Sequence, residues 1–192
     1  MSKKGLIFIV TGPSGVGKKT ILDKIIFKKE LNLKYSVSST TRKPRIGEKN
    51  GVDYFFLSDD EFKNKIKNNE LIEWVEFAGN CYGTLESEVK KYIEDGINVV
   101  LEIEVEGGQK VFEKLNREDY CSIFITPPSI EELERRLIVR NTESIDKIKL
   151  RMAKASSEID FAKFYDHVVL NDISDKAAEK IEKIIREVNN EK

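Results

Sequence analysis

The stretch GPSGVGKKT, Gly12 to Thr20, follows the apolar run LIFIV and precedes a segment with helical apolar periodicity. The form G-x-x-x-x-G-K-[ST] is typical of a phosphate-binding loop between a strand and a helix. Glycines there let backbone N–H groups surround phosphate oxygens, and the positive end of the helix dipole favours the anion. This strand–loop–helix order constrains the fold most, because it places the chain among α/β proteins.

The loop departs from the usual form at one position. Lys19 occupies the place of the hydroxyl residue, and Thr20 follows one residue later. One residue is a rotation of about 100° along a helix, so Thr20 does not simply replace a hydroxyl at 19. Mg²⁺ is then expected to be held mainly by nucleotide phosphates and water, with Thr20 contacting either a phosphate or the ion. Lys19 either points to solvent or adds a charge near the phosphates. The expected nucleotide contacts in the loop are Gly12, Ser14, Gly15, Val16, Gly17, Lys18, Lys19 and Thr20.

Strand and helix patterns alternate along much of the chain. Four β-branched, apolar runs are expected to be buried strands: 6–10, 98–103, 121–125 and 167–170. Helical patterns separate them: 18–29, 108–115, two helices within 130–164, and 176–188. Buried strands alternating with helices predict a parallel sheet flanked by helices, the core of a P-loop NTPase fold.

Residues 33–96 have a different pattern and are expected to form a mixed α/β insertion. Two runs alternate like strands, and Asn50-Gly51 between them predicts a hairpin turn. Ser58 and Glu61 form a capping-box signature for a short helix, and Gly96 is expected to end a helix over 86–95.

Two groups of arginines are candidates for anion binding. Arg42 and Arg45 are placed to clamp an anion with planar, bidentate donors, and Tyr54 and Tyr82 add hydroxyl groups. Farther along are Arg136, Arg140 and Arg151, which are expected to be brought together by a turn between two helices. The alternative for each group is a solvated, charged surface. Phosphoryl transfer depends largely on positioning and cationic stabilisation, and a chain with a phosphate-binding loop and separate arginine groups has these parts.

Composition limits the class of partner. The 33 basic and 34 acidic residues nearly cancel, which does not favour a nucleic-acid partner. No run approaches the roughly 20 apolar residues that cross a bilayer. Two cysteines are too few for a disulfide scaffold and indicate reduced thiols, so a cytoplasmic protein with no membrane partner is expected, either monomer or homo-oligomer.

The order of the motifs resembles guanylate kinase over nearly the whole chain. The matching segments are GPSGVGK, SVSSTTRKPRIGEKNGVDYFF, LIEWVEFAGNCYGT, VLEIEVEGG, FITPPS, RRLIVRNTES and VVLND. The resemblance implies Mg²⁺-dependent phosphoryl transfer from ATP to GMP, and to dGMP as well. It also implies five segments: core 1–32, GMP-binding insertion 33–96, core 97–126, helical lid 127–156 and core 157–192.

The resemblance implies roles for individual residues as well. Ser38, Glu73 and Thr84 match guanine contacts, whereas Arg42, Arg45, Tyr54 and Tyr82 match the GMP phosphate site. Lys18, Arg42 and the lid residues Arg136, Arg140 and Arg151 match the residues that act on the transferring group, and Asn171 lies where the family approaches adenine. From pattern alone, Glu73 is equally well a surface glutamate of an amphipathic strand.

Several positions depart from the family pattern. Glu104 stands where the family commonly has Asp, which changes how that carboxylate reaches GMP or metal-bound water. Glu106, Gly108, Asn141 and Lys19 are further departures. The sequence has two alternative interpretations: a non-catalytic, guanylate-kinase-like protein-binding module, and a P-loop kinase for another phosphate acceptor.

Overall fold

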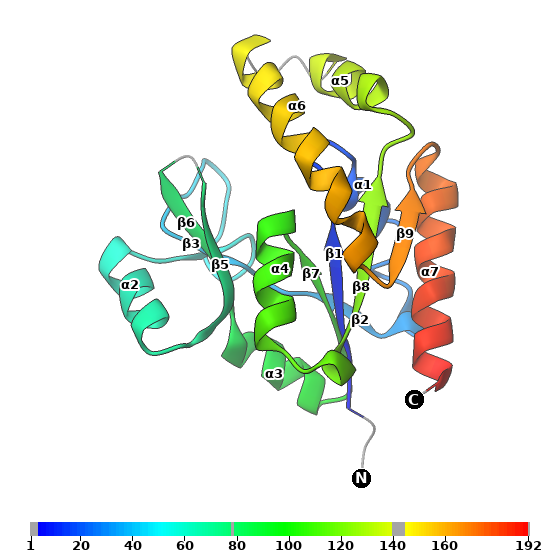
Figure 1. The fold of residues 1–192 in the computed structure, drawn as a ribbon. Helices are drawn as coiled ribbons and strands as arrows, with labels where there is room; N and C mark the ends of the chain where they lie inside the picture. Colours follow the sequence, from blue (N-terminus) through cyan, green and yellow to red (C-terminus); the bar gives the residue numbers. More distant parts are fainter. Residues whose placement is uncertain (1–3, 78, 140–144, 192) are drawn as a thin grey trace.

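The computed structural model describes residues 4–77, 79–139 and 145–191. A five-stranded parallel sheet forms the core, with strand order β2-β7-β1-β8-β9 (Figure 1). The strands are β1 (Ile7–Thr11), β2 (Leu33–Tyr35), β7 (Asn98–Glu102), β8 (Tyr120–Thr126) and β9 (His167–Leu170). The α/β fold with a helix-flanked parallel sheet is therefore confirmed, as are the four predicted strands.

Side chains of β1 alternate between the two faces of the sheet and contribute to a hydrophobic cluster on each face. Phe8 and Val10 pack in one cluster with residues of α1 (Lys18–Leu22) and α7 (Ser174–Glu191). Ile7 and Ile9 pack in a second cluster, with α3 (Glu86–Glu94) and α4 (Val105–Lys114). Because successive residues of a strand point to opposite faces, one apolar run supplies both clusters.

The strand β2 is the fifth strand of the sheet and was not predicted as such. Residues 33–35 pair with β7, so the start of the predicted insertion belongs to the core sheet. The strand is three residues long, and its middle residue Lys34 is exposed, so it lacks the buried apolar run that marks the other strands.

The insertion carries a second sheet, with strand order β4-β3-β6-β5, and lies beside the core (Figure 1). Its elements are β3 (Ser39–Thr40), β4 (Phe55–Phe56), β5 (Leu71–Phe77), β6 (Asn80–Leu85) and α2 (Asp59–Lys67). The predicted capping box is present at the start of α2, where the Ser58 hydroxyl accepts from the Glu61 N–H and the Glu61 carboxylate accepts from the Ser58 N–H.

The predicted hairpin at Asn50-Gly51 is wrong, because β3 and β4 pair in parallel. The connecting loop makes a local turn closed by the Asp53 N–H, which donates to the Lys49 carbonyl. The Asn50 side chain accepts from the Phe56 N–H and so ties this loop to β4.

Helices α5 (Ile130–Val139) and α6 (Ile145–Ile159) lie at the carboxyl edge of the core sheet, consistent with the two predicted helices (Figure 1). Helix α1 is shorter than predicted, since Ile25 N–H bonds to Leu22 O and the chain continues as turns. Short 3₁₀ helices are η1 (Lys29–Leu31), η2 (Arg117–Asp119) and η3 (Asp160–Phe164). Within the described ranges, no helix has both the length and the apolar character to cross a bilayer.

Candidate active site

The loop between β1 and α1 has the backbone of a phosphate-binding loop. Gly15 and Gly17 have φ of 89° and 97°, a region that favours glycine, and α1 begins directly after Gly17. The Lys18 ammonium folds back over the loop and donates to the Gly12 carbonyl at 2.7 Å, leaving the side chain only 9% exposed. The loop therefore combines a helix N-terminus with a lysine whose ammonium is held against the loop backbone.

Lys19 points along the surface of α1 toward β2. Its ammonium is 3.1 Å from the Asp23 carboxylate and 5.1 Å from the centre of the Tyr35 ring, and the side chain is 70% exposed. The Tyr35 hydroxyl also donates to Asp23. These contacts neutralise the Lys19 charge outside the loop.

A cavity of about 290 Å³ adjoins the phosphate-binding loop. It is lined by Gly15, Val16, Gly17, Thr20, Arg135, Arg136, Val139 and Asn171. The Asn171 amide donates to the Val16 carbonyl at 2.6 Å, and Arg136 donates to the Asn171 carbonyl at 2.9 Å. This cavity thus brings together the loop and Asn171, which were predicted to contact ATP, and Arg136, which was predicted to act on the transferring phosphoryl group.

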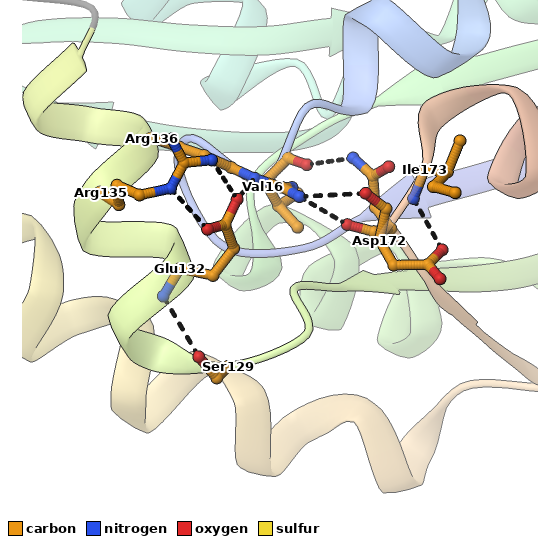
Figure 2. Close-up of polar contacts among 8 residues, drawn as sticks. Val16, Ser129, Glu132, Arg135, Arg136, Asp172 and Ile173 are labelled. Atoms are coloured by element: carbon orange, nitrogen blue, oxygen red, sulfur yellow. Dashed lines mark hydrogen bonds and ion pairs between the residues drawn. The ribbon is translucent and has the colours of Figure 1, made fainter.

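One carboxylate organises the arginines of the cavity. Figure 2 shows Glu132 accepting hydrogen bonds from both Arg135 and Arg136. The two guanidinium groups hold the pKa of Glu132 at about 2. Arg135 and Glu132 were missed as site residues, because their i,i+3 spacing equally fits a solvated helix surface.

Of the other two predicted lid arginines, only Arg151 belongs to the described residues. Arg151 lies on α6 and is partly exposed. Arg140 and Asn141 lie outside the described residues. Among the described lid arginines, Arg136 lines the cavity that adjoins the phosphate-binding loop.

The insertion holds a second cationic centre around Arg42. Its guanidinium forms a bidentate pair with Glu48, at 3.0 and 2.9 Å, and lies 5.3 Å from the centre of the Tyr54 ring. Tyr54 in turn packs edge-on against Tyr82. The Arg42 hydrogen bonds hold the pKa of Glu48 below its usual range. The sequence did not predict a role for Glu48, whose bidentate pair with Arg42 fixes the orientation of the guanidinium plane.

Arg45 and Ser38 border this centre. The Arg45 side chain is exposed, and its backbone N–H donates to Glu48 at 2.7 Å. Ser38 lies between β2 and β3, where its carbonyl accepts from the Phe55 N–H. Both residues belong to the segment that carries Arg42.

A buried carboxylate lies between the second sheet and helix α4. Glu73 on β5 is 5% exposed and accepts from the Thr84 hydroxyl on β6 at 2.7 Å. Burial raises the pKa of Glu73 to about 7. Gly107 of α4 makes room for this carboxylate, because a Cβ there would lie 2.9 Å from Glu73 Oε2. The interpretation of Glu73 as a surface glutamate is therefore wrong.

Comparison with known proteins identifies the family. The guanylate kinase family model matches residues 4–188. The chain is 54% identical to guanylate kinase of Malacoplasma penetrans, over 97% of this chain and 95% of that protein. It is 44% identical to guanylate kinase of Bacillus subtilis, over 96% and 90%. The chain belongs to the guanylate kinase family.

A solved structure supports the same assignment. The crystal structure of guanylate kinase from Anaplasma phagocytophilum superposes with a TM-score of 0.74 at 34% identity, covering 96% of this chain and 86% of that one. The resemblance found from motif order is thereby confirmed.

Glu104, one of the departures from the guanylate kinase pattern, directly precedes α4 and lies between the phosphate-binding loop and α6. Its Oε1 is 3.9 Å from Lys18 Nζ, and its Oε2 is 3.9 Å from Lys154 Nζ. The longer carboxylate is therefore shared between the loop lysine and a lysine of α6. Glu106, another departure, pairs with Lys110 at 3.1 Å.

The residues near the loop fit Mg²⁺ as an ion held largely by a nucleotide. Among the described residues, no three His, Cys, Asp or Glu side chains are grouped to hold a metal. Two oxygen donors near the loop are the Thr20 hydroxyl at the cavity and the Glu104 carboxylate beside Lys18. A few oxygen donors suit an ion that keeps several waters and binds nucleotide phosphates.

Proposed function

We propose that this protein transfers the γ-phosphoryl group of ATP to GMP or dGMP, giving ADP and the nucleoside diphosphate. The observation that carries this proposal is the buried Glu73–Thr84 pair in the insertion, which accompanies the cationic Arg42 centre. A base-reading carboxylate and a phosphate-binding arginine in one insertion define a nucleoside monophosphate as the acceptor. The phosphate-binding loop on the core then serves the donor.

Guanine selectivity follows from the chemistry of Glu73. Guanine presents its N1–H and 2-amino group as adjacent donors, which one carboxylate accepts together. Adenine presents an unprotonated N1 at the same place, so its lone pair would face the buried carboxylate. Leaving buried polar groups mismatched in this way costs factors of about 10⁴ or more. Thr84 and Ser38 are proposed to complete the base site.

The proposed roles in transfer divide between the two cationic centres. Lys18 moves from the Gly12 carbonyl to the donor phosphates, while Arg136, Arg140 and Arg151 neutralise charge on the transferring group. Arg42 and Arg45, with the Tyr54 and Tyr82 hydroxyls, orient the GMP phosphate as the nucleophile. Bound Mg²⁺ supplies further neutralisation of the phosphate charge, with Thr20 as its candidate ligand from the chain. Asn171 is proposed to approach the adenine of ATP.

A protein-binding module without catalysis is the second function considered. Such a module has no need of the phosphate-contacting cations, yet this chain retains Lys18 in the loop, Arg42 in the insertion and Arg136 at the cavity. The enzyme is therefore favoured. A cytoplasmic location without nucleic-acid or membrane partners, as inferred from composition, belongs to the same proposal.

The test is phosphoryl transfer from ATP to GMP, AMP, CMP and UMP in a coupled assay with and without EDTA. We expect turnover of GMP only, and its loss on chelation. Glu73→Gln is expected to lower kcat/KM for GMP by at least 100-fold and to leave the KM for ATP within about twofold. Glu76→Gln, on the exposed face of the same strand, is the control. Retained GMP binding without turnover of any nucleotide would support the binding module instead.

A further inference from the structure

Lys154 occupies a central position in a row of charges that leads away from the phosphate-binding loop. Its ammonium lies 3.9 Å from Glu104 Oε2 and 3.5 Å from Glu158 Oε1. The other oxygen of Glu104 faces Lys18 of the loop at 3.9 Å. Two carboxylates and two ammonium groups thus alternate in the order Lys18, Glu104, Lys154, Glu158.

Glu158 makes this row unusual, because it is buried. The residue is 5% exposed, and within the described part of the chain neither carboxylate oxygen accepts a hydrogen bond. A buried carboxylate without hydrogen bonds is expensive unless a cation lies close to it. Lys154, one turn earlier on α6, supplies that cation.

Lys154 also reaches the insertion. Its ammonium lies 5.7 Å from the centre of the Phe77 ring, at the end of β5. Phe77 and Glu73 are four residues apart on β5 and therefore share a face of that strand. One side chain of α6 thus contacts its own helix, the Glu104 carboxylate of the core and the strand that carries the base-reading carboxylate.

We propose that Lys154 is a positioning residue for the acceptor site. In the proposed mechanism Lys18 leaves Glu104 to meet the donor phosphates, and Lys154 is then the cation that holds the Glu104 carboxylate directed toward GMP. This inference rests on the proposed function.

The experiment compares Lys154→Met with Lys154→Arg, and uses Lys183→Met as a matched control. Lys183 forms the same i,i+4 pair with Glu187, at 3.6 Å, on the surface of α7. The readouts are the KM for GMP, the KM for ATP and the calorimetric Kd of GMP. For Lys154→Met we expect the affinity for GMP to fall about fivefold, which is the loss expected when a partly exposed ion pair is broken. The KM for ATP is expected to change less than twofold. Lys154→Arg is expected to restore most of the loss.

A double-mutant cycle with Glu104→Gln separates positioning from general destabilisation. In the Glu104→Gln background, Lys154→Met is expected to change GMP affinity by less than twofold. A fivefold loss that persists in that background, or a Lys154→Met enzyme that behaves like Lys183→Met, overturns the inference. Lys154→Gln carries the same test if the methionine variant unfolds. Failure of the wild-type protein to phosphorylate GMP overturns the proposed function itself, and the calorimetric comparison still decides the role of Lys154.

Discussion

At the scale of single residues, the ionised form of Glu73 is the one proposed to bind GMP, but its burial lowers the stability of the unliganded protein. Burial raises its pKa to about 7, so between pH 4.5 and pH 7 the folded protein binds more protons than the unfolded chain. The free energy of unfolding therefore falls as pH rises through this window. Glu73→Gln removes the ionisation, and we expect it to stabilise the unliganded protein at pH 8 by about 2 to 3 kcal/mol.

Urea unfolding of wild type and Glu73→Gln at pH 8 and pH 4.5 measures this effect. At pH 4.5 the wild-type carboxyl is protonated in the fold, so the two proteins are expected to differ by less than about 1 kcal/mol. A difference that does not change with pH would contradict the ionisation of a buried Glu73.

The same carboxyl links GMP binding to protons. Guanine donors require the ionised form of Glu73, so GMP binding near pH 7 is expected to release part of a proton from this group. Calorimetry in two buffers of different ionisation enthalpy measures the release. The GMP phosphate also titrates near this pH, and Glu73→Gln, which retains the phosphate contribution, serves as the reference. Equal proton release by both proteins refutes the link.

Lys19 is expected to contribute little to nucleotide binding, because its ammonium is paired with Asp23 and Tyr35. Lys19→Ala should leave the affinity for ATP within about twofold at low salt, where exposed charges act most strongly. Lys18→Ala is the positive control, with an expected loss of at least tenfold. A salt-dependent loss for Lys19→Ala would place its charge near the phosphates.

At the scale of elements, helix α4 lies against Glu73, the proposed guanine contact. Gly107 lies in the first turns of α4, where alanine favours a helix by about 1 kcal/mol over glycine. A Cβ at that position would nevertheless lie 2.9 Å from Glu73 Oε2. Gly107→Ala is therefore expected to weaken GMP binding at least tenfold while changing the free energy of unfolding by less than about 1 kcal/mol.

Calorimetric GMP titration and urea unfolding of this variant give the two quantities. Glu113→Ala, at an exposed position of the same helix, is the control. Unchanged GMP affinity in Gly107→Ala would mean that the Glu73 carboxylate shifts freely, and that α4 does not shape the site.

Elements differ in how far the sequence predicts them. The strands β1, β7 and β8 are continuous runs of buried, mostly apolar residues, so the local sequence is enough to locate them. The strands β3 and β4 have two residues each, and their parallel pairing depends on the loop that Arg42 and Glu48 fold. A local turn signal carries no information about such a pairing, and for this reason the hairpin prediction failed.

The residues of the candidate site likewise differ in how far the sequence predicts them. Glu73 and Thr84 were predicted separately, and the antiparallel pairing of β5 and β6 places them opposite each other. The sequence did not predict a role for three residues near the candidate site, Glu48, Glu132 and Lys154. Their contacts depend on which surface of a loop or helix faces the candidate site in the folded protein. Helical spacing alone fits a solvated surface equally well, so tertiary packing decides between the two.

At the scale of the whole molecule, the two cationic centres lie on different parts of the chain. The phosphate-binding loop belongs to the core and Arg136 to α5, whereas Arg42 belongs to the insertion. A phosphoryl group can pass directly from donor to acceptor only when these parts approach each other. Closure of this kind also excludes water, which would otherwise accept the phosphoryl group.

Small-angle scattering measures this closure. We expect the radius of gyration to decrease when GMP and a non-hydrolysable ATP analogue are both bound, and to decrease less with either ligand alone. Glu73→Gln should fail to compact at GMP concentrations that compact the wild-type protein, because its acceptor site stays unfilled. An unchanged radius with both sites saturated would require the transfer to occur without closure, and the rate of ATP hydrolysis without GMP should then approach the rate of transfer.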